Sequence, residues 1–374
     1  MKWSWKIAEF SGIGVYVHAT FLLVVLWVAA LHWGEDVTAI VEGVLFVLAI
    51  FGCVVLHEFG HALMAKRYGI RTRDITLLPI GGVARLERMP DDPKQELAVA
   101  VAGPAVNVVI AALLYLVVQF VQGVDLSGQL ERLEPFYLGT GSFAYNLMVV
   151  NIFLVVFNMI PAFPMDGGRV LRGLLATRME YVRATNIAAS VGQFIAFVFG
   201  FIGLFYNPFL VFIALFVYIG ATQEAGMVQM KAALGGIPVE RAMLRNFHAL
   251  SPRDPLQRAI DLTLAGAQRD FPVLDEGQVV GLLCQEDLMR ALQQTPADQA
   301  VAGVMRTQYQ HCEPGDMLET VFARIQEDGA HTVPVVRRGE LVGLLTMENI
   351  GEMLRIQAAI DKQRGEDRLT QVDV

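Results

Sequence analysis

The chain has 374 residues, of which 54% are apolar and only 18% are charged, and its mean hydropathy is +0.47. Soluble globular proteins carry about a quarter charged residues, so this composition disfavours an entirely soluble protein and excludes intrinsic disorder. The formal net charge is −8 and no Lys/Arg tract occurs. These features exclude nucleic acid as the expected partner.

Charged residues are distributed unevenly along the chain. Residues 1–232 contain 31 charged side chains, whereas the shorter segment 233–374 contains 35. This contrast predicts a membrane part followed by a soluble, mildly acidic part. We therefore expect an α-helical polytopic membrane domain over residues 1–230, with small β elements on its cytoplasmic side, and then a soluble α/β module.

Six apolar segments approach the length of about 20 residues that a helix needs to cross a bilayer. They cover residues 15–33, 40–64, 97–121, 143–160, 187–206 and 209–227. Lys and Arg gather at the N-terminus and in the second and fourth loops, while the other loops carry one or none. Since basic loops stay in the cytoplasm, we expect six spans with both termini cytoplasmic.

The second apolar segment ends in the motif His57-Glu58-Phe59-Gly60-His61. Histidines four residues apart share one helix face, so both imidazoles can reach one Zn²⁺, and the intervening Glu58 can take a proton from water. The alternative is a polar helix end at the membrane surface. Two His and a Glu near membrane depth are costly without a function, which favours the metal site.

A catalytic zinc ion needs a third protein ligand beside its open position. The fourth apolar segment continues into Asn158-Met159-Ile160-Pro161-Ala162-Phe163-Pro164-Met165-Asp166-Gly167-Gly168 on the same side of the membrane. Proline and glycine interrupt the helix here, and irregular backbone at membrane depth is tolerated where it lines a cavity. Asp166 is the candidate third ligand; the alternative is a polar turn that caps itself.

These motifs, in this order, resemble the site-2 protease family of intramembrane zinc metalloproteases, especially its bacterial and archaeal branch with six spans and a C-terminal regulatory domain. The stretches Leu78-Pro79-Ile80-Gly81-Gly82-Val83 and Ala102-Gly103-Pro104-Ala105-Val106-Asn107 also carry the resemblance. It implies that one Zn²⁺ is bound by His57, His61 and Asp166, with Glu58 as general base. It also implies that Asn158 contacts the substrate or the developing oxyanion.

The resemblance further implies the reaction and its setting. The expected activity is hydrolysis of a peptide bond within or next to a transmembrane segment of a membrane protein, in a prokaryotic cytoplasmic membrane. Two alternatives stay open: a catalytically silent relative that only binds membrane proteins, and a transporter gated by its soluble module. A transporter needs polar residues through the whole membrane thickness, whereas here they gather at one end of two spans.

The loop after the second apolar segment suggests how a substrate would bind. Residues 72–78 and 80–86 and the N-terminal residues 3–17 have the composition of short strands. We hypothesise a small sheet whose edge takes an unwound substrate segment by strand addition, with Gly81 and Gly82 allowing two backbones to approach. A plain hairpin bend is the alternative.

The C-terminal part repeats itself with a constant offset of 62 residues. Met243 maps to Met305, Pro272 to Pro334 and Gly281 to Gly343, and strands at 271–274 and 279–284 recur at 332–336 and 341–346. Such self-similarity indicates two copies of one supersecondary unit. The pattern resembles a pair of CBS domains, over residues 237–296 and 299–356, followed by a polar, frayed tail at 357–374.

The CBS family often binds adenine nucleotides, through a hydroxyl residue that contacts phosphate and an Asp that holds the ribose. Here the second copy keeps Thr346 but has Asn349 in place of the Asp, and the first copy keeps Asp287 but has Cys284 in place of the hydroxyl residue. Two interpretations stay open. The module either binds ATP or AMP, or serves only as a structural element or as a homodimer interface.

Overall fold

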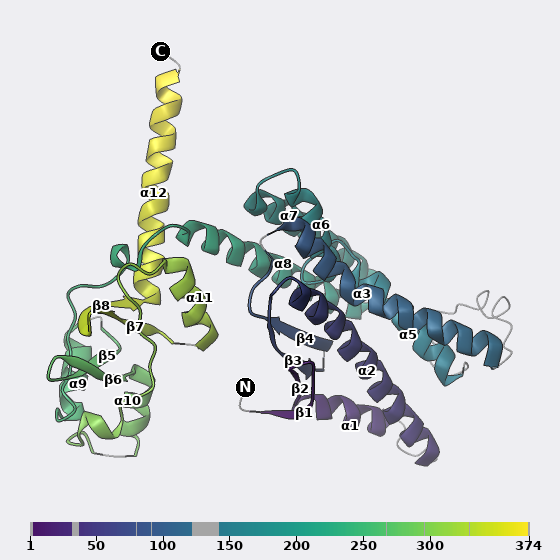
Figure 1. Cartoon of the computed structure of the whole chain (residues 1–374), viewed down its shortest axis with the longest axis horizontal. Coiled ribbons are helices and arrows are strands. Elements are labelled where there is room, and N and C mark those ends of the chain that lie inside the picture. Colours follow the sequence, from purple (N-terminus) through teal and green to yellow (C-terminus); the bar gives the residue numbers. More distant parts are fainter. Residues whose placement is uncertain are drawn as a thin grey trace. The chain divides into compact units, whose positions relative to one another are not determined.

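The computed structural model describes residues 3–31, 37–79, 81–90, 92–121, 142–266, 268–294, 296–328 and 330–372. The chain divides into two compact units, Met1–Val228 and Gln229–Val374 (Figure 1). Ile80 and the loop 122–141, which contains Arg132, were part of the sequence argument and lie outside the described residues.

The first unit is built mainly from helices. They are α1 (Phe21–Leu31), α2 (Val37–Arg67), α3 (Pro93–Leu116), a π-helical turn η1 (Val117–Val121), α5 (Phe143–Asn158), α6 (Asp166–Ala176), α7 (Tyr181–Tyr206) and α8 (Pro208–Leu234), whose last residues belong to the second unit. Within the described ranges, α2, α3, α7 and α8 are long and apolar enough to cross a membrane, while α1 and α5 are shorter apolar helices. Six full-length spans are therefore not confirmed.

The first predicted span was wrong at its start, because residues 15–18 belong to strand β2 (Ile13–His18). The error has a physical cause: a short apolar run rich in valine suits a strand as well as a helix. Helix α1 begins only at Phe21 and has 11 residues, which corresponds to about 16 Å of helix.

Side-chain caps mark where two of these helices begin. Asp92 accepts a hydrogen bond from the Lys94 backbone N–H at 2.9 Å, and Pro93 follows it at the first turn of α3. Ser142 accepts a hydrogen bond from the Tyr145 N–H at 3.3 Å at the start of α5. Such caps satisfy N–H groups that have no partner within the helix.

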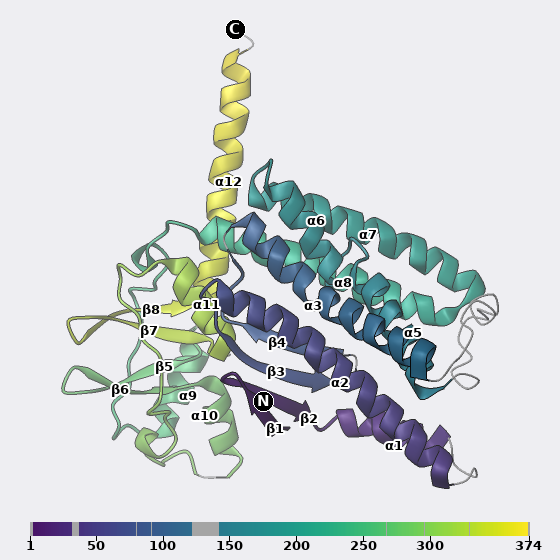
Figure 2. The same ribbon diagram turned by 45° about the vertical axis from the view of Figure 1, so that its right-hand side comes forward.

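Helices α2 and α3 lie side by side in both views of the chain (Figure 2). A Cβ added at Gly60 of α2 would lie 2.6 Å from the Ala102 carbonyl oxygen of α3. The two backbones therefore touch, as is typical of membrane helices that meet through small residues. This close approach holds the metal-site motif of α2 against α3.

A four-stranded sheet accompanies these helices, as the sequence predicted. Its order is β1-β2-β3-β4, from β1 (Ser4–Phe10), β2, β3 (Thr72–Leu78) and β4 (Gly81–Leu86). The outer pairs are antiparallel and β2 runs parallel to β3. Ile13, Ala62 and Ile75 form a buried cluster between the sheet and α2. Strand β4 is one edge of this sheet, and it also packs against α2.

The second unit is an α/β module with one sheet of order β5-β6-β8-β7. Its elements are η2 (Val239–Arg241), α9 (Leu256–Ala265), β5 (Phe271–Asp275), β6 (Gln278–Leu283), α10 (Gln285–Leu292), η3 (Val301–Gly303), α11 (Leu318–Asp328), β7 (Thr332–Arg337), β8 (Glu340–Thr346) and α12 (Met347–Val372). The predicted strands and the predicted duplication are confirmed.

The two copies exchange their leading segments. The Leu244 N–H of the first copy donates to the Leu344 carbonyl of the second. At the equivalent positions, 62 residues apart, the Leu282 N–H of the first copy donates to the Arg306 carbonyl of the second. Each copy therefore completes the other. The tail after Ile356 was predicted to be frayed, but α12 continues through it to Val372, because its Ala, Gln, Lys, Arg and Glu residues favour helix even without an apolar face.

Candidate metal centre

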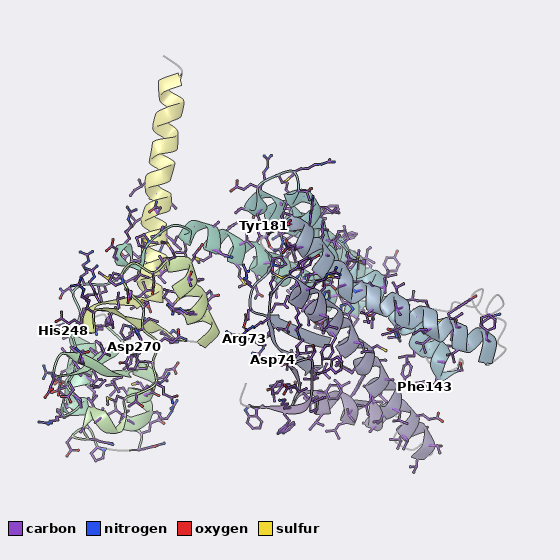
Figure 3. All side chains as sticks on the ribbon, in the orientation of Figure 1. Arg73, Asp74, Phe143, Tyr181, His248 and Asp270 are labelled. Atoms are coloured by element: carbon purple, nitrogen blue, oxygen red, sulfur yellow. The ribbon has the colours of Figure 1, made fainter. Side chains whose placement is uncertain are left out.

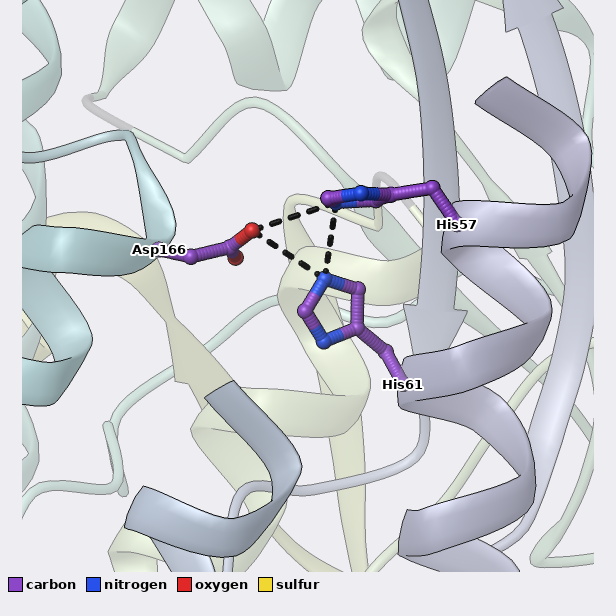
Figure 4. A group of neighbouring side chains, drawn as sticks. All are labelled: His57, His61 and Asp166. Atoms are coloured by element: carbon purple, nitrogen blue, oxygen red, sulfur yellow. Dashed lines mark hydrogen bonds and ion pairs between the residues drawn. The ribbon is translucent and has the colours of Figure 1, made fainter. Parts of the chain in front are cut away.

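Helix α2 places two imidazoles on one face, as the spacing of His57 and His61 requires (Figure 4). Their Nε2 atoms lie 3.1 Å apart, and both side chains are buried. Each Nε2 also lies 3.2 Å from the Asp166 Oδ2 of α6. Two histidines four residues apart and an aspartate more than a hundred residues later therefore converge on one point.

The segment between α5 and α6 delivers Asp166 to this point. Two glycines allow its backbone to pack closely against its neighbours. A Cβ at Gly220 of α8 would lie 2.6 Å from Pro164 Cδ, and one at Gly168 would lie 2.6 Å from the Phe163 nitrogen. Ala162 and Phe163 are fully buried. Close packing on several sides leaves the segment little freedom, so the position of Asp166 is set by its neighbours.

Hydrogen bonds to the other ring nitrogens determine which imidazole atoms are free. The His61 Nδ1–H donates to the Val99 carbonyl at 2.7 Å, and the His57 Nδ1–H donates to Asn107 Oδ1 at 2.9 Å. Asn107 in turn donates to Asn151 Oδ1 at 3.2 Å. Such partners fix the tautomer of a metal-binding histidine, and they leave both Nε2 lone pairs facing Asp166.

The residues fit a zinc ion. Zinc bonds of about 2.0–2.1 Å with tetrahedral geometry put ligand atoms about 3.4 Å apart, close to the observed 3.1–3.2 Å. In the tautomers above all three atoms are acceptors, so a cation at their centre satisfies all of them together. His57, His61 and Asp166 form the one group of potential ligands of this kind within the described ranges.

Gly103 of α3 forms one wall of this group. A Cβ added there would lie 2.7 Å from His57 Nε2 and would contact His61 Nε2 even more closely. Any larger residue would therefore fill the space where the ligand atoms converge. The sequence singled out the stretch around Gly103 only as part of a family motif and assigned it no role.

Glu58 follows His57 in α2 and is half-buried. One of its carboxylate oxygens, Oε2, accepts a hydrogen bond from the Ala84 backbone N–H of β4 at 3.1 Å. A Cβ at Gly82 would lie 2.9 Å from Glu58 Cγ, so Gly82 lets the edge strand lie directly over this carboxylate. Gly81 has a φ of +136°, a conformation that glycine adopts without strain.

Asn158 is the last residue of α5 and is half-buried. The described residues include no hydrogen-bond partner for its side chain, so the structure brings together the three potential ligands, Glu58 and Gly82, but gives no contact that tests Asn158.

The sequence missed a buried ion-pair cluster beside the site. Arg172 of α6 donates from Nε to Glu96 Oε1 of α3 at 2.7 Å and from Nη1 to Glu224 Oε1 of α8 at 2.5 Å. Burial favours the neutral form of the Arg172 guanidinium, yet the charges of Glu96 and Glu224 raise its pKa overall. The only sequence signal for this cluster is an arginine close behind an apolar segment, a pattern that by itself indicates only membrane topology.

The second unit contains a cavity of about 900 Å³ lined by both repeats. Thr346, Cys284 and Asn349 line it, and Asp270, labelled in Figure 3, accepts a hydrogen bond from Thr332 Oγ1 at 2.7 Å. Asp287 is not part of the lining; its carboxylate pairs with the Arg306 side chain at 2.5 Å. Burial raises the pKa of the Cys284 thiol to about 11, so it is uncharged at neutral pH.

Comparison with known proteins agrees with this architecture. The sequence model of peptidase family M50 matches residues 45–199, and that of the CBS domain matches residues 239–294 and 301–354. A zinc metalloprotease of Methanocaldococcus jannaschii is 34% identical over 284 residues, which are 76% of this chain and 78% of that protein. A Synechocystis protein provisionally named a zinc metalloprotease is 27% identical over 95% of this chain and 96% of its own length. Among solved structures, a site-2 protease from M. jannaschii aligns over 60% of this chain and 95% of its own, with 36% identity and a TM-score of 0.44.

Proposed function

This chain is a metalloendopeptidase of the site-2 protease family, peptidase family M50, with tandem CBS domains, and from that premise we propose that it cleaves membrane proteins within or next to a transmembrane segment. The observation that carries the proposal is the convergence of His57, His61 and Asp166 on one point beside Glu58, at the end of an apolar helix.

The proposed roles follow from the positions of the side chains. His57, His61 and Asp166 hold Zn²⁺, which when bound supplies Lewis acidity to a water molecule and to the scissile carbonyl. Glu58 takes the proton of the attacking water and passes it to the leaving amine. The Ala84 N–H donates to the Glu58 carboxylate and so orients it before a substrate binds. Asn158 is proposed to contact the substrate or the developing oxyanion.

We place the protein in a prokaryotic cytoplasmic membrane with both termini in the cytoplasm. The four long apolar helices support a membrane location. The six-span topology rests on α1 and α5 as further membrane segments and on the alternation of basic loops. In this orientation the metal site lies near the cytoplasmic surface, since Lys66 and Arg67 end the same helix.

Strand β4 is proposed to receive the substrate. It is one of the two edge strands of the described sheet, and its Ala84 N–H donates to Glu58. A substrate segment that pairs with this edge would run past the proposed general base with its backbone extended, as peptide hydrolysis requires. Strand addition of this kind derives affinity from main-chain hydrogen bonds and so tolerates varied sequences.

Replacing Gly82 with Val tests this arrangement. The new side chain would displace either β4 or Glu58, because the added Cβ lies 2.9 Å from both Glu58 Cγ and Val54 Cγ1. We expect cleavage to fall about 10²-fold, the usual cost of a displacement of about 1 Å at a reacting centre, while zinc stays bound. Val83→Ile, at an exposed neighbouring position, is the matched control. Unchanged cleavage in Gly82→Val would contradict the docking site.

We propose that the CBS module regulates the enzyme by binding AMP or ATP in its cavity. Both repeats line the cavity, and its volume suits a nucleotide. Helix α8 supports a regulatory link, because it runs without a break from the first unit to Leu234, which is buried in the core of the second. We also propose that two copies of the chain form a homodimer through their CBS domains.

Calorimetric titration with AMP and ATP tests the nucleotide site. We expect measurable heat at or below millimolar ligand, and an affinity about tenfold weaker in Thr346→Ala, since one hydrogen bond to a charged group contributes about 1.5–3 kcal/mol. Thr320→Ala is the matched control, because Thr320 is exposed and does not line the cavity. No heat at millimolar ligand would leave the module a purely structural or dimerising role.

The proposed function itself is tested with the purified full-length protein in detergent. We expect about one zinc ion per chain by elemental analysis and cleavage of a generic single-span substrate that stops on chelation and returns with added zinc. Zinc without cleavage of any of several single-span substrates would favour the catalytically silent relative. A metal-free protein would contradict the metal centre.

A further inference from the structure

Arg172 is the largest fully buried side chain in the described part of the chain, and the proposed reaction does not use it. Its guanidinium lies over the rings of Phe163 and Tyr181, 5.0 and 5.1 Å from their centroids, and pairs with Glu96 and Glu224. Tyr181 is labelled in Figure 3 at the start of α7. One side chain thus joins α6 to α3, α7, α8 and the segment that precedes α6.

A buried guanidinium costs several kcal/mol unless its partners compensate for lost hydration. The planar fork of arginine suits this task, because it binds two carboxylates in fixed directions while its faces contact aromatic rings. These contacts restrict both the rotation of α6 about its axis and its displacement along that axis. Asp166 is the first residue of the same 11-residue helix, so any movement of α6 moves Asp166.

Helix α8 contacts the Asp166 segment twice on one face. Gly220 contacts Pro164, two residues before Asp166, and Glu224 pairs with Arg172, six residues after it. Residues four apart lie above one another on a helix, so these two contacts clamp α6 and its leading segment from one side. The Glu224 side chain is 29% exposed, whereas that of Glu96 is 1% exposed. Glu224 is therefore the partner of Arg172 that can be replaced without leaving a cavity in the core.

We propose that Arg172 is a positioning residue for the metal centre: clamped by Glu96 of α3 and Glu224 of α8, it holds α6 so that Asp166 meets the two histidines. The inference rests on the proposed metal centre, and it extends the site to α8 through Gly220 and Glu224. Loss of the Glu224 half loosens Asp166 and weakens metal binding without removing a ligand.

Zinc affinity of the full-length protein, measured by competition with a chromophoric chelator, tests the proposal. We expect Glu224→Ala to raise the zinc dissociation constant about tenfold, the low end for groups that orient metal ligands. Glu224→Gln keeps an acceptor oxygen for Arg172 and should recover most of the affinity. Glu180→Ala is the matched control, because Glu180 is exposed and makes no capping hydrogen bond at the start of α7.

A spectroscopic readout separates positioning from a loss of stability alone. With Co²⁺ in place of zinc, a displaced Asp166 changes the visible absorption spectrum, and we expect that change in Glu224→Ala but not in Glu180→Ala. Equal dissociation constants and equal spectra in wild type and Glu224→Ala would overturn the positioning role. So would an equal loss in Glu180→Ala. A wild-type protein without zinc would overturn the metal centre itself, which distinguishes the two failures.

Discussion

Glu58→Gln is expected to lower peptide hydrolysis by about 10²–10⁴-fold, the usual contribution of a positioned general base, while zinc stays bound. Glutamine has the same shape and keeps an oxygen that accepts the Ala84 N–H, so the contact between α2 and β4 survives. It cannot take a proton from water at neutral pH. The measurement is the initial rate of cleavage of a single-span substrate beside the zinc content of the same preparation.

Glu42→Gln is the matched control for this experiment, because Glu42 is an exposed residue of the same helix. We expect its rate and zinc content to equal those of the wild type. A Glu58→Gln protein that cleaves normally would show that Glu58 is not the base. One that loses zinc together with activity would instead give Glu58 a role in holding the metal site together.

Gly103→Ala is expected to weaken zinc binding by more than 10²-fold. The added methyl group would lie within 2.7 Å of His57 Nε2 and closer still to His61 Nε2, in the space where the ligand atoms converge. Helix α3 has little room to withdraw from α2, because α5 and α6 also pack against it. Interiors packed this tightly respond to one extra methyl group by displacing side chains, and here those side chains are the ligands.

Zinc content after dialysis against a weak chelator is the measurement for Gly103→Ala. Gly52→Ala provides the control: Gly52 lies in the same helix as the histidines, and a Cβ there meets nothing within 4 Å. Alanine should stabilise that helix slightly and leave zinc bound. Full zinc content in Gly103→Ala would show that α3 moves aside, and that the glycine serves packing alone.

The local parts of this protein follow from its sequence. The pair His57 and His61 needs only a helix to share one face, and Glu58 lies between them for the same reason. The strands of the first sheet and the repeat of the second unit could also be predicted. The β-branched composition of the strands and the constant offset of the repeat are both visible in the sequence itself and do not depend on how the elements pack. The one clear error of this kind, residues 15–18, lies where strand and helix patterns coincide.

The tertiary structure alone decides how distant elements complete the site. Asp166 was a candidate by topology, but its 3.2 Å approach to both imidazoles depends on how the preceding segment packs, with Ala162 against Gly192 of α7 and Pro164 against Gly220 of α8. The tautomers depend on Asn107 and the Val99 carbonyl of α3. Arg172 pairs with Glu96, 76 positions before it, and with Glu224, 52 positions after it. Spacing along a helix is set by the geometry of a single backbone, whereas these contacts exist only once separate helices have packed, so sequence periodicity does not encode them.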